Sequence, residues 1–145
     1  YQSRTSVNLA KILVEKYWNK QVTYIDTSED FTHSIKGTVA GVVIGDRALE
    51  QRLDAAYSYD LAEAWKNYSG LPFVFAAWVS NKNLGEDFEE AFNLANGYGL
   101  KHIAEVVAEN PFAAYDLNKY YTENISYTLD AEKRKGLELF LSLLK

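Results

Sequence analysis

The chain has 145 residues with 48% hydrophobic and 24% charged side chains, the composition of a globular protein large enough to bury a core. Its formal net charge of −5 argues against a nucleic-acid partner, because phosphate binding needs a concentrated basic face and the 15 Lys and Arg residues are scattered. It has no cysteine, which excludes disulfides and thiolate metal sites, and its two histidines, His33 and His102, are too isolated to predict a metal centre.

The first predicted element is an amphipathic helix that starts within a few residues of Tyr1. Its apolar side chains recur at helical spacing and are Val7, Ala10, Val14, Tyr17 and Trp18. Polar side chains occupy the opposite stripe. One side of this helix is therefore expected to face a core.

Hydroxyl groups and one guanidinium gather where this helix would begin, at Ser3, Arg4, Thr5 and Ser6. The first turn of a helix exposes unpaired N–H groups and the positive end of the macrodipole, and no acidic residue in this turn complements them. Two interpretations stay open. The cluster holds an external carboxylate or phosphate, or a hydroxyl simply caps the helix, and spacing alone favours capping.

Two continuous apolar runs, 37–45 and 71–79, predict strands buried on both faces of a mostly parallel sheet, and 22–25 predicts a shorter strand. Run 37–45 passes through a glycine turn into a short helix. Asp46 is therefore expected at the carboxyl edge of the sheet, where open α/β sheets bind ligands. Strands alternating with helices predict an α/β fold with helices on both faces of the sheet.

The remaining elements are predicted to be helices. One spans 59–68 and is closed by Gly70 as its C-terminal cap, and a long helical region over 86–109 is expected to break at 96–99. Two more follow, one near 117–125 and one from Asp130 to Leu144.

The aromatic residues of run 71–79, Phe73, Phe75 and Trp78, fit two roles equally well. They form core, or they line a pocket for a planar ring. No Gly-rich phosphate loop accompanies them, so nucleotide binding is not predicted.

No apolar run reaches membrane-spanning length and the N-terminal residues lack the order of a signal peptide, so we expect a cytoplasmic protein with no membrane partner. The sequence contains no methionine, and Tyr1 is therefore not a translational start. We expect the chain to be a piece of a longer protein.

Five stretches occur in a fixed order along the chain: SRTSV at 3–7, VIGDRAL at 43–49, YDLAEAW through GLPFVFAAW at 59–78, YYTENISY at 120–127 and GLELF at 136–140. Together they resemble the menaquinone-biosynthetic chorismate dehydratase of the futalosine pathway over the whole length. The sister dihydroxynaphthoate synthase type usually continues Gly-Leu-Pro with Pro-Leu-Gly, whereas Phe-Val-Phe-Ala follows here. The dehydratase is therefore the better match.

The resemblance implies a type II periplasmic-binding-protein fold of two α/β lobes around a ligand cleft. The chain would be the C-terminal portion of that fold. Residues 1–70 would form the second lobe, and 71–145 the crossing strand and the helices that return to the first lobe. A missing N-terminal region would hold part of the active site, so this fragment alone is expected to be inactive.

The resemblance also implies a lyase that needs neither metal nor cofactor and converts chorismate to 3-[(1-carboxyvinyl)oxy]benzoate. Thr5 and Ser6, with Arg4 as a weaker candidate, would bind one carboxylate of this small-molecule substrate. Asp46, Phe73 and Phe75 would shape the pocket. The proton-abstracting residue is not identified by the motifs, and neither is the oligomeric state.

Two other functions stay open on the sequence. One is a non-catalytic solute-binding protein that closes around a small carboxylate. The other is a purely structural or interaction domain, which predicts no anion at Thr5 and Ser6.

Overall fold

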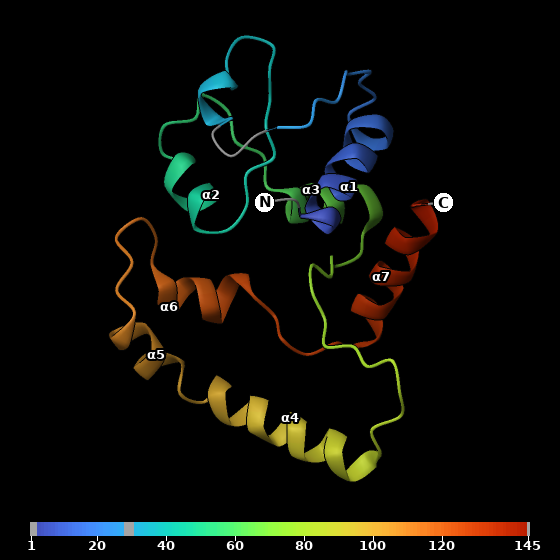
Figure 1. The fold of residues 1–145 in the computed structure, drawn as a ribbon, viewed down its shortest axis with the longest axis vertical. Helices are drawn as coiled ribbons and strands as arrows, with labels where there is room; N and C mark the ends of the chain where they lie inside the picture. Colours follow the sequence, from blue (N-terminus) through green and yellow to red (C-terminus); the bar gives the residue numbers. More distant parts are fainter. Residues whose placement is uncertain (1–2, 28–30, 145) are drawn as a thin grey trace. The chain divides into compact units, whose positions relative to one another are not determined.

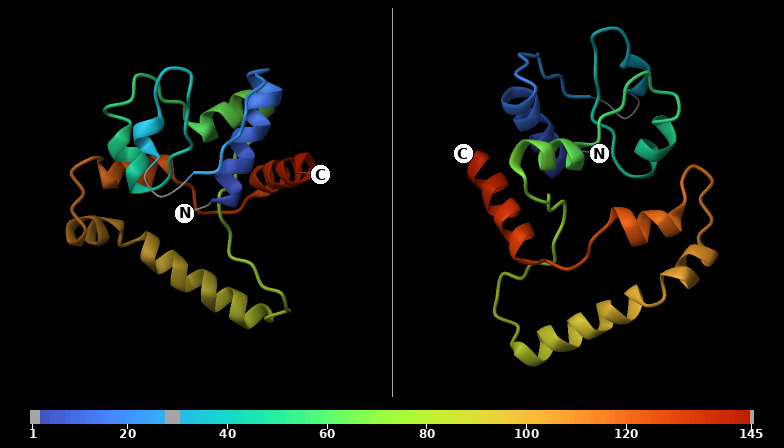
Figure 2. Two further views of the ribbon diagram at one scale, coloured as in Figure 1. Left: turned by 45° about the horizontal axis from the view of Figure 1, so that its top comes forward. Right: turned by 180° about the vertical axis from the view of Figure 1, so that it is seen from behind.

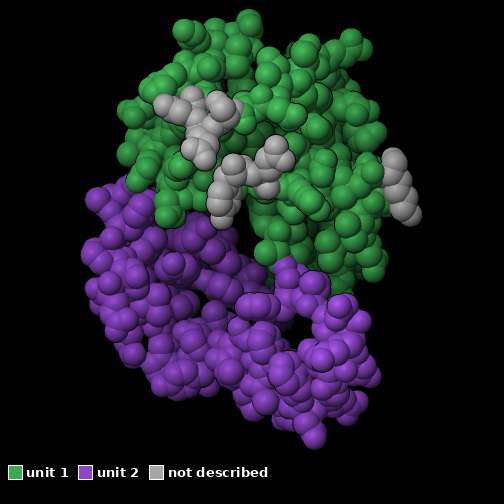
Figure 3. All heavy atoms as spheres, viewed as in Figure 1, with its two compact units in different colours: residues 1–76, 129–145 green, residues 77–128 purple. Residues whose placement is uncertain are grey.

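A computed structural model describes residues 3–27 and 31–144. The chain divides into two compact units, residues 1–76 with 129–145, and residues 77–128 (Figure 3). Each unit is helical in its regular parts (Figure 1).

The predicted parallel sheet is absent from the described residues, so the α/β, periplasmic-binding-protein-like fold is wrong for this structure. Runs 22–25, 37–45 and 71–79 are extended or turning chain without strand pairing. Val39 is 51% exposed in the run that was expected to be buried on both faces. A strand exists only when a neighbour completes its hydrogen bonds, whereas a helix completes its bonds within one segment.

The first unit contains six helical segments within its described residues. They are α1 (Arg4–Ile12), the π-helical turn η1 (Leu13–Tyr17), the 3-10 turn η2 (Thr32–Ser34), α2 (Asp46–Gln51), α3 (Leu61–Ser69) and α7 (Ala131–Leu143). The ends predicted for α3 and α7 are confirmed. Gly70 closes α3 in the left-handed conformation with φ 74°, and the Asp130 carboxylate accepts from the Lys133 backbone N–H at the start of α7.

The second unit contains α4 (Glu86–Leu100), α5 (Ile103–Glu109), α6 (Leu117–Lys119) and the π-helical turn η3 (Tyr120–Asn124). The predicted division of 86–109 into two helices is confirmed, but its position at 96–99 is wrong, because α4 continues through Gly97 and Gly99 and ends at Leu100. Both glycines keep a negative φ there. Glycine weakens a helix by about 1 kcal/mol but does not oblige it to end.

The core of the first unit lies where α1, η1, α3 and α7 meet, and these helices lie side by side in the views of Figures 1 and 2. Its buried hydrophobic cluster consists of Leu9, Ile12, Leu13, Ala64, Trp65 and Phe140. The predicted stripe is therefore only partly right, because Ala10 is buried but two of its other members are exposed. Val7 and Tyr17 are 36% and 37% exposed, while Leu9 and Leu13 are fully buried.

Trp65 is the largest fully buried side chain and sits at the centre of this cluster. Its ring meets those of Phe73 and Phe140 edge-on, with centroid separations of 5.4 and 6.1 Å. The indole N–H of Trp65 has no acceptor among the described residues. The core therefore holds one unpaired donor, a cost usually of about 1 to 3 kcal/mol.

The second unit has no buried residue, although all of residues 77–128 are described. Trp78 packs its ring edge-on against Phe92 at 5.4 Å, yet Trp78 is 82% exposed. Phe88 stacks on Phe92 along α4. These ring contacts lie within α4 and between α4 and the segment before it.

Within residues 3–27 and 31–144, no helix combines the length and the apolar character needed to cross a membrane.

Candidate functional site

The hydroxyl cluster at the start of α1 caps the helix. Ser3 is the N-cap, and its Oγ accepts from the Ser6 backbone N–H at 3.1 Å. The Ser3 hydroxyl also donates to Ser6 Oγ at 3.0 Å. The capping interpretation is therefore confirmed for the Ser6 amide, and the Ser6 side chain is buried at 7% exposure.

Two backbone donors of this turn have no acceptor within the described part of the chain. The backbone amides of Arg4 and Thr5 make no hydrogen bond to another described residue, and the first turn of α1 contains no Asp or Glu. Arg4 is exposed and Thr5 is partly exposed. The turn thus holds two N–H groups without an acceptor among the described residues beside a guanidinium, and an anion site needs such donors. Anion binding at Arg4, Thr5 and Ser6 stays a prediction.

Asp46 lies in the first turn of α2, directly after Gly45 with φ 66°. The glycine turn and the short helix are confirmed. The predicted position at a sheet edge is wrong, because no strand precedes the turn in the described residues. Asp46 is exposed and makes no hydrogen bond or ion pair to Arg4, Thr5 or Ser6 within the described chain.

Phe73 and Phe75 have different surroundings. Their rings meet edge-on at 4.6 Å, and Phe73 also contacts Phe140 at 4.9 Å. Phe73 is thus packed against the core cluster, whereas Phe75 is 47% exposed. Of the two equal roles predicted for these aromatics, Phe73 takes the core role, whereas contact of the exposed Phe75 ring with a ligand stays a prediction.

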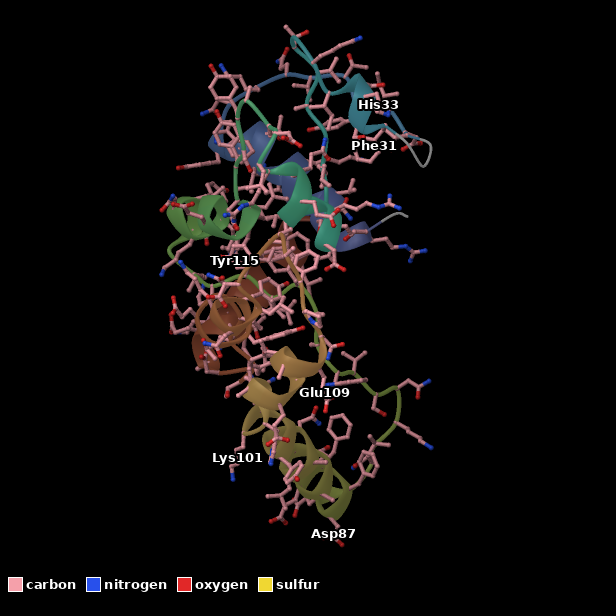
Figure 4. The ribbon with its side chains drawn as sticks, turned by 90° about the vertical axis from the view of Figure 1, so that its left-hand side faces the viewer. Phe31, His33, Asp87, Lys101, Glu109 and Tyr115 are labelled. Atoms are coloured by element: carbon pink, nitrogen blue, oxygen red, sulfur yellow. The ribbon has the colours of Figure 1, made fainter. Side chains whose placement is uncertain are left out.

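The histidines carry no metal-binding arrangement. His102 Nδ1 lies 2.8 Å from the Tyr98 carbonyl oxygen and Nε2 lies 3.9 Å from a Glu105 oxygen, all on neighbouring helical turns. His33 lies on the η2 segment beside Phe31 (Figure 4). Across residues 3–27 and 31–144, no three His, Cys, Asp or Glu side chains are grouped closely enough to hold a metal ion.

The shifted pKa values lie away from the predicted site. Burial raises the pKa of Tyr127, with a further contribution from the neighbouring Tyr121 and Tyr120. The backbone N–H of Lys133 lowers the pKa of Asp130, and the carboxylate of Glu132 raises that of Lys135. These shifts belong to a tyrosine cluster and to the first turn of α7.

Two hollows on the surface were not predicted from the sequence. One, of about 640 Å³, runs along α4 from Glu86 to Lys101, and Figure 4 shows Asp87 and Lys101 at the two ends of that helix. The other, of about 270 Å³, lies between η1 and the start of α3 and includes Trp18 and Tyr59 in its wall. Helical spacing cannot reveal the second hollow, because its walls come from separate segments.

Comparison with known proteins assigns the chain to a family. No solved structure matches it. A family model described as menaquinone biosynthesis matches residues 1–145 and so covers every stretch from SRTSV at 3–7 to GLELF at 136–140. Since the match spans the whole chain, the chain belongs to the menaquinone biosynthesis family and has a role in that pathway.

Proposed function

We propose that the protein is a chorismate dehydratase, a lyase that removes water from chorismate to give 3-[(1-carboxyvinyl)oxy]benzoate. One observation carries this proposal. The five ordered stretches that resemble the dehydratase lie inside a chain that the menaquinone biosynthesis family matches from residue 1 to residue 145.

The reaction requires little covalent chemistry from the protein. The C–H bond breaks at the ring carbon that bears the enol ether, and the C–O bond of the hydroxyl on the adjacent ring carbon breaks. The hydroxyl leaves with the proton as water. The new double bond completes an aromatic ring, which supplies the driving force. The protein therefore needs mainly to orient a dianion and to stabilise charge as the proton leaves.

The start of α1 is our candidate for binding one substrate carboxylate. The backbone amides of Arg4 and Thr5 would donate to it, and the Arg4 guanidinium would add a charge-assisted bond. The Ser6 amide already donates to Ser3, so Ser6 would contribute through its hydroxyl. The exposed ring of Phe75 and the carboxylate of Asp46 are further candidates for contact with the substrate.

Incubation of the protein with chorismate tests the reaction. We expect the absorbance of the ring diene to fall while an aromatic benzoate forms, with the product identified by its mass. Both the 145-residue chain and the product of the complete reading frame that encodes it are to be assayed. If both bind chorismate tightly and neither consumes it, the protein is a carboxylate-binding protein and the dehydratase proposal is wrong.

A further inference from the structure

The 270 Å³ hollow between η1 and α3 has an aromatic wall. Tyr17 and Trp18 come from the end of the first helix, and Tyr59 precedes α3. The Trp18 ring lies 5.8 Å from Tyr17 at 49° and 5.7 Å from Tyr59 at 63°. The three rings are therefore in contact with one another and line the hollow together, and aromatic rings attract cations.

The rest of the wall consists of small and polar residues, two of which are acidic. Asp60 and Glu63 line the hollow, and no Lys or Arg does. Asp60 Oδ1 accepts from the amides of Ala62 and Glu63 at 2.7 and 3.0 Å, so that oxygen caps α3. Neither Asp60 Oδ2 nor the Glu63 carboxylate has a hydrogen-bond or ion-pair partner in the part of the chain that is described.

Capping explains one of these charges but not both. A helix N-terminus corresponds to roughly half a positive charge, whereas the two carboxylates bring two negative charges. A net negative potential therefore remains in a hollow that three aromatic side chains also line. Such surroundings repel a carboxylate and attract a cation.

We propose that this hollow binds a small organic cation, an alkylammonium group held by Trp18 and Tyr59 and neutralised by Asp60 and Glu63. A pocket of this volume admits a trimethylammonium head but is small for a drug-sized ligand, since such pockets begin at about 300 Å³. The site is separate from the anion site proposed at the start of α1 and does not depend on the dehydratase activity.

Choline is the probe, and 3,3-dimethyl-1-butanol is its control, because it has the same shape with carbon in place of the charged nitrogen. Both are titrated against the Trp78→Phe variant, so that the highly exposed Trp78 does not obscure the fluorescence of Trp18. We expect choline to bind about tenfold more tightly than the alcohol, the ratio that about 1.4 kcal/mol of cation–aromatic attraction gives. Equal responses to the two compounds would overturn the proposal.

Two pairs of variants, made in the Trp78→Phe protein, test whether the residues that line the hollow bind choline. Glu63→Gln and Tyr59→Ser should each weaken choline binding severalfold. Their matched controls, Glu15→Gln and Tyr57→Ser, change exposed residues outside the hollow and should leave choline binding unchanged. Circular dichroism checks that all four variants keep their helices. If a folded Glu63→Gln and a folded Tyr59→Ser bind choline as the parent does, the hollow is not a cation site.

Discussion

Gly136 of α7 lies so close to the carbonyl oxygen of Pro72 that no β-carbon fits between them. Gly136 is buried, and Leu71 approaches the same point at 3.6 Å from where a β-carbon would stand. The obstacle is backbone, which cannot rotate away as the end of a long side chain can. This contact joins the C-terminal helix to the segment that leads from α3 into Phe73.

Gly136→Ala is expected to destabilise the first unit, although alanine is the better helix former by about 1 kcal/mol. Overpacking against backbone costs about 1 to 3 kcal/mol, so the clash outweighs the gain in helix propensity. Chemical denaturation followed by the fluorescence of Trp65 measures the difference.

Gly97→Ala is the matched control for this prediction. Gly97 is also a helical glycine, but a β-carbon there would meet nothing within 4 Å. It should leave the first unit unchanged and raise the helicity of α4 slightly. If Gly136→Ala proves as stable as the parent, α7 does not approach Pro72 as described.

A second prediction concerns Trp65. Its ring is fully buried in the core, and its indole N–H has no acceptor among the described residues. Trp65→Ala should lower the free energy of unfolding by about 3 to 5 kcal/mol. Trp65→Phe should cost less than half as much, since it keeps an aromatic ring and removes a buried donor worth about 1 to 3 kcal/mol. Trp78→Phe, at a highly exposed position, should change the stability by less than about 0.5 kcal/mol. Urea denaturation of the three variants compares these values, and equal losses for both Trp65 variants would show that the N–H is satisfied.

A third prediction concerns how the stability of α7 depends on pH through the Asp130 carboxylate. The backbone N–H of Lys133 and then its side chain lower the pKa of Asp130 below its ordinary value of 3.8. A lowered pKa in the folded state means that the cap stabilises α7 fully above the unfolded-state pKa and is lost as the pH falls through the folded-state pKa. The loss should therefore occur below pH 3.8.

Carboxyl carbon shifts measured by NMR give the midpoint of Asp130 directly. Asp130→Asn keeps a capping side chain that cannot titrate, so it should flatten the dependence of stability on pH in this acidic range. A midpoint at or above 3.8 would show that Lys133 does not hold the carboxylate in solution.

Substitutions of Ser6 and Ser3 distinguish anion binding from helix capping at the start of α1. Under the proposed function, Ser6→Ala should weaken chorismate binding by about 1 to 3 kcal/mol, the cost of losing a hydrogen bond to a charged group. Ser3→Ala removes the cap and should lower helix stability by about 1 kcal/mol while it disturbs binding less. Isothermal titration with chorismate, alongside thermal unfolding, measures both. If Ser6→Ala alters only stability, the hydroxyl cluster is a cap and nothing more.

Only part of the candidate site could be predicted from the sequence, because some of its contacts join residues that are far apart in the chain. The motif at 3–7 marked a helix start, and Ser3 capping of Ser6 is a contact over three residues that spacing can foresee. Whether Phe73 faces core or ligand depends on Phe140, which is far along the chain. The hollow beside Trp18 likewise needs Tyr59, more than a helix length away in sequence, and no periodic pattern contains it.

The sequence by itself determined the helix ends at Gly70 and Asp130, because a left-handed glycine and a capping carboxylate act within one turn. It also determined the family, because the order of the stretches is a property of the sequence. Only the tertiary structure decided which face of α1 is buried, and it left runs 37–45 and 71–79 without strand partners. Burial and strand pairing both depend on contacts with residues far away in the sequence. A local pattern indicates that a segment can make such contacts, but it does not indicate whether a partner segment is present.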